Sequence, residues 1–247
     1  MTQITRTDRQ LLPPLTPQQK VAVMLRILFH EGYDDHLAGH ITFRQPDGTF
    51  LANPWELSWD EIRPEDVVRI DVDGKVLEGH WTVTPAIKLH LELHKRREVK
   101  WAMHNHARWS TIYADLKRIP PVYDQTGAGV PDSEICLFDE YDGDVAHVEN
   151  AAAAAEAMGD HNIALLAHHG VFISANSTPQ LLHRSIAIEW RSRQAWHVET
   201  VNPNAEPMKA EVANQFGSVL DQFGGIPGQF EALARRELRR DPTLLDG

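Results

Sequence analysis

The sequence predicts one three-layer α/β/α domain with a mostly antiparallel central sheet. Short strand patterns are mixed with helix patterns, without the regular strand–helix–strand repeat of a parallel sheet. Two strand pairs surround Asp-Gly dipeptides, at 47–48 and 73–74, which are typical of tight antiparallel hairpins. A length of 247 residues fits a single large domain.

The first half of the chain opens with an arm and a clearly marked helix. Residues 1–15 are polar and contain prolines, so we expect an arm that lies on the body or on a neighbouring subunit. Thr16 and Pro17 start a helix, because threonine caps helix N-termini and proline is favoured in the first turn. Apolar residues at helical spacing continue it to about Gly32. The patterns that follow predict strands at 40–44, 49–53, 67–72, 75–77 and 99–104, and helices at 85–97 and 107–116.

The second half begins with a loop-rich stretch at 117–146. Beyond it, the patterns predict helices at 151–158 and 178–198, strands at 163–167 and 171–174, and two helical regions at 209–220 and 230–240. We therefore divide the chain into an N-terminal arm (1–15), the main domain (16–204) and a C-terminal helical tail (205–247). The tail is expected to contact a neighbouring subunit.

Composition excludes several classes of function. A formal net charge of −11 argues against a general nucleic-acid surface, which needs clustered basic residues. Cys136 is the single cysteine, so no intrachain disulfide can form, and a reducing, cytoplasmic setting is expected. The N-terminus lacks the apolar core of a signal peptide, and no apolar run is long enough to span a membrane. The 14 histidines are an unusually high number.

Histidines follow two separate apolar strand patterns. His104 and His106 come after the strand at 99–103, and residues i and i+2 of an extended segment point to the same face. The second pattern, Leu-Leu-Ala-His-His-Gly at 165–170, also ends in imidazoles, and Gly170 is expected to allow a sharp turn. Three imidazoles and one open position are typical of a catalytic divalent metal, whereas structural zinc usually takes four ligands. The alternative interpretation is polar histidines at strand ends.

These segments resemble the class II aldolase/adducin family. This family includes sugar-phosphate aldolases, a ribulose-phosphate epimerase, adducin heads and decarboxylases of hydroxylated aromatic dicarboxylates. The similarity covers about two thirds of the chain, from about 35 to 200, and includes GHITFR (39–44), NPWELSWDEI (53–62), VVRIDVDGKVLEG (67–79), PAIKLHLELHKRREVKWAMHNH (85–106) and ALLAHHGVF (164–172).

The resemblance implies a class II aldolase-like fold and a specific metal site. Carried over residue by residue, the ligands are His104, His106 and His169, with His168 beside the ligand position. The ion would be Zn²⁺ or Mn²⁺, one per subunit, with Co²⁺ or Fe²⁺ as further options. The resemblance also implies a homotetramer, or a multiple of it, with active sites at subunit junctions.

The departures from the family pattern point away from a sugar phosphate. Sugar-phosphate aldolases carry a glutamate before the His-x-His strand, but residues 84–87 contain no carboxylate. Their phosphate-binding Gly-Asn segment corresponds here to Gly39-His40, and the second phosphate segment to Asn53-Pro54-Trp55. Both changes resemble the adducin side of the family. Adducin heads, however, lack the metal histidines that this chain retains.

These features favour a metal-dependent carbon–carbon lyase. The preferred reaction is decarboxylation of a hydroxylated, aromatic carboxylic acid through a metal-stabilised enolate or carbanion. Such a reaction needs a proton donor, whereas retro-aldol cleavage also needs a base on the substrate hydroxyl. The alternatives are a class II (retro-)aldolase acting on a small aldol without phosphate, an adducin-like interaction module, and a zinc-stabilised structural domain.

Other candidate site residues surround this metal site. His40, Arg44, Asn53 and Trp55 are predicted to bind the small-molecule carboxylate substrate, and His90 could replace the missing glutamate as acid or base. By resemblance, Tyr123 matches a tyrosine that donates a proton from a neighbouring subunit. Residues 34–36 (Asp-Asp-His) are expected to form a solvated turn.

Overall fold

The computed structural model describes residues 11–139 and 148–246. One eight-stranded sheet runs through the domain in the order β4-β3-β2-β1-β5-β8-β7-β6. Its strands are β1 (His40–Arg44), β2 (Phe50–Ala52), β3 (Val68–Ile70), β4 (Val76–Glu78), β5 (Trp101–Asn105), β6 (Ile135–Phe138), β7 (Ile163–Leu166) and β8 (Gly170–Ala175). All neighbouring pairs are antiparallel except β6 and β7, so the predicted mostly antiparallel sheet is confirmed.

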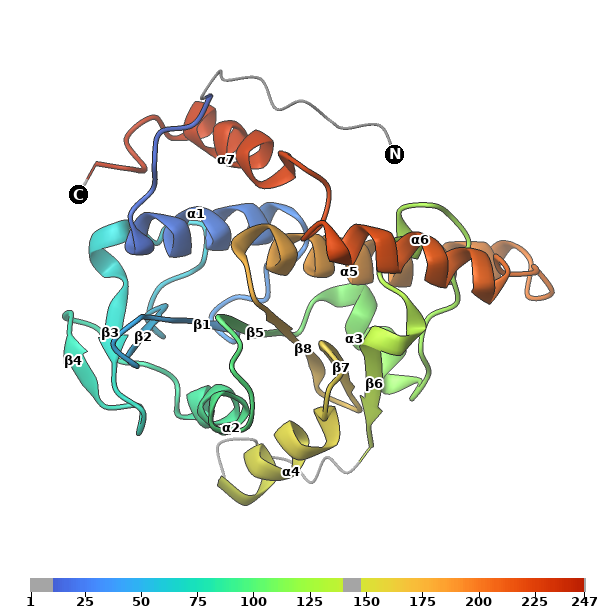
Figure 1. Cartoon of the computed structure of the whole chain (residues 1–247), viewed down its shortest axis with the longest axis horizontal. Helices are drawn as coiled ribbons and strands as arrows, with labels where there is room; N and C mark the ends of the chain where they lie inside the picture. Colours follow the sequence, from blue (N-terminus) through green and yellow to red (C-terminus); the bar gives the residue numbers. More distant parts are fainter. Residues whose placement is uncertain (1–10, 140–147, 247) are drawn as a thin grey trace.

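Helices cover both faces of the sheet, which confirms the three-layer α/β/α prediction (Figure 1). The helices are α1 (Pro17–His30), α2 (Lys88–Arg96), α3 (Arg108–Asp115), α4 (Val148–Met158), α5 (Thr178–Val201), α6 (Ala210–Gln222) and α7 (Gln229–Arg240). One core cluster joins α1, α3, α5 and α7 to one face, and a second joins α2 and α4 to the other. Short 3₁₀ turns lie at Pro64–Asp66, Pro85–Ile87, Gly127–Gly129 and Asp132–Glu134.

The helix starts follow the predicted chemistry. The side chain of Thr16 accepts a hydrogen bond from the Gln19 amide (3.2 Å), and the Gln19 side chain accepts one from the Thr16 amide (2.9 Å). This reciprocal pair satisfies two amides that the helix itself cannot. The helix predicted at 85–97 begins instead as a 3₁₀ turn at Pro85–Ile87 and becomes α-helical at Lys88.

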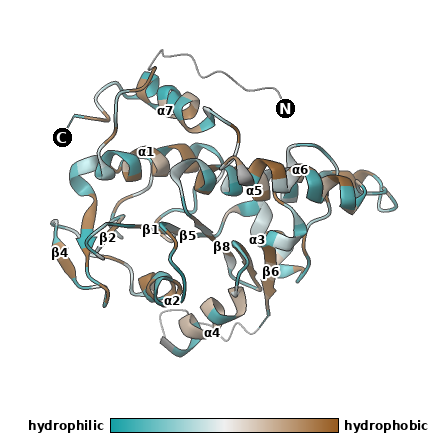
Figure 2. Ribbon diagram, in the orientation of Figure 1, coloured by the Kyte–Doolittle hydropathy of each residue, from teal (hydrophilic) through white to brown (hydrophobic). Residues whose placement is uncertain are grey.

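The stretch 117–146 contains a strand that the sequence interpretation missed. β6 pairs in parallel with β7 at the edge of the sheet. Its four residues, Ile-Cys-Leu-Phe, are hydrophobic along their whole length and show no alternation (Figure 2). A run this short cannot be assigned to a strand by periodicity alone.

The C-terminal tail is partly built into the main core. Phe230 and Ala234 on α7, together with Leu244 beyond it, are buried in the cluster that includes α1. α6 extends beyond the rest of the molecule at the right of Figure 1. Residues 1–10 of the predicted N-terminal arm lie outside the described residues.

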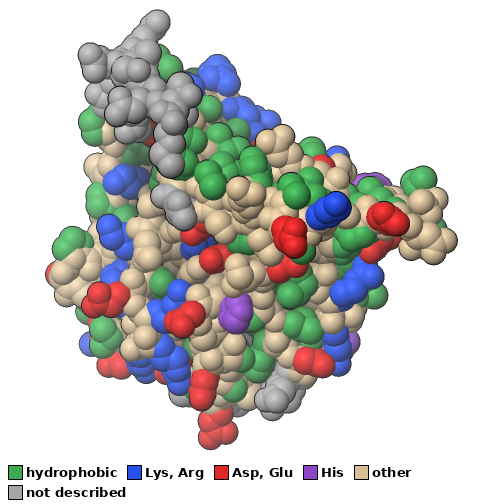
Figure 3. All heavy atoms as spheres, turned by 45° about the vertical axis from the view of Figure 1, so that its right-hand side comes forward, with side chains coloured by type: hydrophobic (Ala, Val, Ile, Leu, Met, Phe, Trp, Pro, Cys, Tyr) green, Lys and Arg blue, Asp and Glu red, His purple; other side chains and the backbone are tan. Residues whose placement is uncertain are grey.

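Basic and acidic side chains are mixed on the visible surface. On the face shown in Figure 3, lysine and arginine side chains are interspersed with aspartate and glutamate. No helix in the described part of the chain is long and apolar enough to cross a membrane.

Candidate metal centre

Three imidazoles from two chain segments meet at one end of the central strands. His104 lies in β5, His106 follows that strand directly, and His169 lies in the turn that joins β7 to β8. One nitrogen of each ring lies within 4.8 Å of the other two, close enough to share a metal ion. The ring centroids are 4.5–4.9 Å apart.

Hydrogen bonds to the outer nitrogens fix the tautomers of two of these rings. The Nδ1 atom of His104 lies 3.0 Å from the Val171 carbonyl, and the Nδ1 atom of His106 lies 2.6 Å from Asp35 Oδ2. A carbonyl and a carboxylate can only accept, so each Nδ1 donates and each Nε2 retains its lone pair. The same arrangement orients histidine ligands around metals in other proteins.

The two Nε2 atoms of His104 and His106 lie 3.1 Å apart. Because both are acceptors in these tautomers, neither can donate a hydrogen bond to the other, and a cation between them removes the repulsion. Two nitrogens bound tetrahedrally at about 2.0–2.1 Å would be separated by about 3.3 Å. The donor set and its spacing therefore fit a divalent metal ion.

Burial keeps His104 in the form that a metal requires. The pKa of His104 is well below its usual value, first because the ring is fully buried and then because His169, His40 and other imidazoles surround it. A neutral imidazole is the metal-binding form.

The turn that carries His169 differs from the expectation in one detail. Gly170 does not supply the sharp turn; the left-handed backbone lies at His168, with a φ of 57°. Gly170 is needed because an added Cβ would lie 2.6 Å from the Asn105 carbonyl oxygen and 2.8 Å from Cδ2 of His106. The glycine therefore permits close approach of β8 to β5, which brings His169 beside the other two ligands.

The prediction that residues 34–36 form a solvated turn is wrong for Asp35. Its carboxylate accepts the short hydrogen bond from His106 and is 27% exposed. No pattern in the sequence links positions 35 and 106, because the contact depends on where the loop between α1 and β1 lies relative to the end of β5. The neighbouring side chain of His36 is 93% exposed, as a solvated turn requires.

Two other predicted site residues, His40 and His90, lie next to the triad. His40 pairs with His104 across β1 and β5, and their ring centroids are 4.8 Å apart. The Nδ1 atom of His40 lies 2.8 Å from Nε2 of His90. Both rings are buried, and burial lowers the pKa of His40 to about 3 and that of His90 well below its usual value.

The remaining predicted residues lie in different surroundings. Arg44 donates to the His94 carbonyl (2.5 Å) and lies over the Phe50 ring. Asn53 is buried, and its amide joins β1 to the following loop by accepting from the Ile41 amide (2.8 Å) and donating to Gly39 and Pro54 carbonyls. Trp55 is 45% exposed. The Tyr123 hydroxyl donates to the Ala205 carbonyl (3.3 Å), where the C-terminal tail begins.

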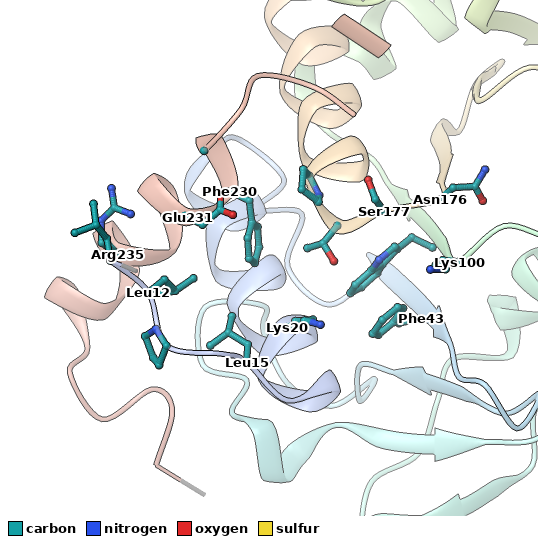
Figure 4. A pocket seen from close by; sticks show the side chains of 16 residues that line it. Leu12, Leu15, Lys20, Phe43, Lys100, Asn176, Ser177, Phe230, Glu231 and Arg235 are labelled. Atoms are coloured by element: carbon teal, nitrogen blue, oxygen red, sulfur yellow. The ribbon is translucent and has the colours of Figure 1, made fainter. Parts of the chain in front are cut away.

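A cavity of about 890 Å³ lies at the opposite end of β5 from the triad. It is bordered by Lys100 and Trp101 at the start of that strand, whereas His104 stands near its end. Figure 4 shows Leu12, Phe43 and Phe230 among the side chains that line it, from three separate segments. The cavity is therefore separate from the metal centre.

Comparison with known proteins agrees with this geometry. Residues 19–196 match the family described as Class II Aldolase and Adducin N-terminal domain. The chain is 28% identical over 233 residues to the decarboxylase NovR of Streptomyces niveus, covering 90% of this chain and 84% of NovR. It is also 28% identical over 233 residues to a 4-hydroxy-3-prenylphenylpyruvate oxygenase/4-hydroxy-3-prenylbenzoate synthase of Streptomyces roseochromogenus, covering 90% of this chain and 82% of that protein.

Solved structures share the same fold. L-fuculose 1-phosphate aldolase from Glaciozyma antarctica superposes with a TM-score of 0.81 at 19% identity, covering 96% of this chain and 97% of its own. An aldolase II superfamily protein from Pseudomonas syringae gives 0.82 at 20% identity, covering 93% and 97%.

Proposed function

Because this chain belongs to the class II aldolase/adducin family, we propose that it is a metal-dependent carboxy-lyase that decarboxylates a hydroxylated, aromatic carboxylic acid. The wider assignment, a metal-dependent lyase of the class II aldolase family, follows from the family match and the histidine triad. Relatives of this chain include decarboxylases, aldolases and epimerases, so the choice of reaction depends on the site.

The observation that supports decarboxylation most directly is the chemistry of the groups around the triad. The ion-binding group found among the described residues consists of three histidines and no carboxylate. Where the sugar-phosphate aldolases have a glutamate, this chain has the Thr84-capped turn at Pro85–Ile87. The acid–base groups on this side are the neutral imidazoles of His40 and His90.

Neutral imidazoles suit a reaction that must deliver a proton. When bound, the metal ion supplies a Lewis acid that stabilises the negative charge left after CO₂ departs. The remaining step is proton delivery to carbon, for which an imidazole N–H is a suitable donor. A retro-aldolase also needs a base on the substrate hydroxyl. The nearby carboxylate of Asp35 is already engaged by His106, and burial, which lowers the pKa of His40 to about 3, makes that imidazole a weak base.

The relatives give independent support. NovR is a decarboxylase by name, and the Streptomyces roseochromogenus relative acts on prenylated hydroxyphenyl compounds by name. We propose an aromatic acid for this chain on that basis, with the half-exposed Trp55 as a candidate contact to its ring. The second candidate, a retro-aldolase on an aldol without phosphate, is favoured only by the sugar-phosphate relatives.

The test is a metal-dependent CO₂-release assay on a panel of ortho-hydroxy aromatic acids. Protein loaded with Zn²⁺ or Mn²⁺ is expected to release CO₂, and a chelator or His104→Ala should abolish the release. His168→Asn is the matched control, because His168 is exposed and asparagine tolerates its left-handed backbone. Release of an aldehyde without CO₂ across the panel would select the retro-aldolase. Full activity without metal would contradict both reactions, and absence of bound metal would favour an adducin-like module.

We further propose that the chain assembles into a homotetramer, with the 205–247 tail and Tyr123 near a neighbouring site. Several large apolar side chains on the outer helices are exposed, including Val201 at 87%, Phe223 at 72% and Val212 at 53%. Light scattering that gives a monomer would refute this assembly.

A further inference from the structure

A chain of hydrogen bonds leads away from the metal centre between β1 and α2. It begins at His40, beside His104, and continues through the 2.8 Å contact from Nδ1 of His40 to Nε2 of His90. Nδ1 of His90 lies 2.9 Å from the Thr42 hydroxyl, which lies 2.9 Å from Nε2 of His94. The four side chains thus form one continuous path of three hydrogen bonds.

The path is continuous because the residues that face each other have a similar spacing along β1 and along α2. His40 and Thr42 are two residues apart on one face of β1, a spacing of about 6.6–6.8 Å. His90 and His94 are four residues apart on one face of α2, a rise of about 6 Å. Each strand residue therefore lies opposite the corresponding helix residue.

Every member of the path is buried. His90 and Thr42 are 0% exposed, His40 is 2% exposed, and His94 is 6% exposed, so His94 is the member nearest solvent. The Nδ1 atom of His94 is itself buried, and the Val99 backbone is a further influence on this ring. Burial lowers the pKa of His94 to about 3, and Arg44 is the next cause, so all three rings stay neutral.

Neutral imidazoles joined by a hydroxyl allow two complementary arrangements of the same protons. In one, each ring donates outward and Nε2 of His40 carries a lone pair. In the other, each ring donates inward and Nε2 of His40 carries the proton. The two forms interconvert when one proton moves across each hydrogen bond while one proton enters at one end of the path and another leaves at the other end, so that every ring stays neutral.

We propose a proton relay formed by His94, Thr42, His90 and His40. It carries protons to the metal centre from the outer side of α2. This inference rests on the proposed decarboxylation and names the source of its proton. His40 gives the proton on Nε2 to the substrate carbon and receives one from His90 on Nδ1. His90 is reprotonated by the Thr42 hydroxyl, Thr42 by Nε2 of His94, and His94, the member nearest solvent, by a solvent proton. One solvent proton is consumed for each CO₂ released, which balances the reaction.

Thr42 is the residue that distinguishes a relay from ordinary packing. Thr42→Val keeps the shape of the side chain and removes the hydroxyl that links His90 to His94, whereas Thr42→Ser keeps the hydroxyl. Thr111→Val is the matched control, because it removes a buried hydroxyl that has no hydrogen-bond partner in this structure. None of these changes alters a metal ligand.

The decisive measurement is ¹⁵N NMR of histidine-labelled protein, with and without Zn²⁺. In the wild type, Thr42→Ser and Thr111→Val proteins, the ring nitrogens of His40 and His90 are expected to show shifts averaged between the protonated and unprotonated forms. In Thr42→Val, each ring should be fixed in one tautomer. Fixed tautomers in the wild type, or averaged shifts that persist in Thr42→Val, would overturn the relay.

A kinetic measurement separates the relay from the proposed function. If the metal-loaded protein decarboxylates an aromatic acid, Thr42→Val should lower kcat about tenfold or more with little change in KM, and Thr42→Ser should restore it. An unchanged kcat in Thr42→Val would refute the relay while leaving the decarboxylase intact. If no CO₂ is released by any protein, the proposed function fails, and the NMR result still decides whether the proton path exists.

Discussion

The hydrogen bond between Asp35 and His106 gives the sharpest test of the metal centre, because it can be weakened without removing a ligand. We expect Asp35→Asn to lower the affinity for Zn²⁺ about tenfold and Asp35→Ala to lower it about 30- to 100-fold. In both variants the three imidazoles remain, so any loss must come from the support that the carboxylate gives to one of them.

The magnitudes follow from the geometry. The distance of 2.6 Å from Nδ1 to Oδ2 is at the short end for a charge-assisted hydrogen bond. Such bonds contribute about 1.5–3 kcal/mol, and about half of that is lost when the acceptor is neutral. Asparagine can still accept from Nδ1 but carries no charge, which gives a loss of about 0.8–1.5 kcal/mol. Alanine loses the whole contribution, within the 10- to 100-fold range typical of residues that support metal ligands.

Competition with a chromophoric chelator at neutral pH measures these affinities directly. Asp34→Asn is the matched control, because it removes a neighbouring charge that makes no hydrogen bond to a ligand histidine in the described structure. If Asp35→Asn and Asp35→Ala bind Zn²⁺ as tightly as Asp34→Asn, the carboxylate does not support His106 and the tautomer argument for the site is wrong.

Three further predictions concern the same part of the molecule. Gly170→Ala should destabilise the fold by about 1–3 kcal/mol and weaken metal binding, because the added Cβ would lie 2.6 Å from the Asn105 carbonyl oxygen. Urea unfolding measures the loss of stability, and the chelator assay measures the loss of metal affinity. The metal-free protein should lose stability as the pH falls below about 6.5. In the folded chain the pKa values of His40 and His94 lie at about 3, so these rings stay unprotonated there, whereas the same rings in the unfolded chain bind protons. These two rings give a slope of up to about 3 kcal/mol per pH unit, so equal urea midpoints at pH 7 and pH 5 would contradict the assignment. Zn²⁺ at about 100 times its Kd should stabilise the protein by about 2.7 kcal/mol, a rise in Tm of about 5–11 °C that His104→Ala should remove.

The parts of the fold that sequence reasoning could predict are those with local signals. The helix that starts at Pro17 has a capping threonine, and the two Asp-Gly hairpins have turn residues suited to their geometry. His104 lies in β5 and His106 directly follows it, and the alternation of an extended segment directs both toward one side. Local chemistry therefore predicted most helices and strands, and two of the three proposed ligands.

The parts that could not be predicted depend on tertiary contacts. Asp35 acquires its role only because the loop between α1 and β1 lies beside His106, 71 positions away in the chain. The relay residues Thr42 and His94 belong to patterns that were visible, a strand alternation and an i, i+4 helix pair, but their meeting depends on how α2 crosses β1. Gly170 was singled out for a turn, whereas the structure requires it for close packing.

The concentration of histidines explains why the metal centre and the fold depend on one another. Rings at positions 40, 90, 94 and 104 are buried and neutral, which is costly unless each polar nitrogen has a partner. Hydrogen bonds satisfy most of these nitrogens, but the facing Nε2 atoms of His104 and His106 cannot donate to each other and suit a cation or an added proton. A proton placed there competes with the metal, so acid should both release the ion and destabilise the fold. The same burial that holds the ligands ready for a metal thus makes the centre sensitive to acid.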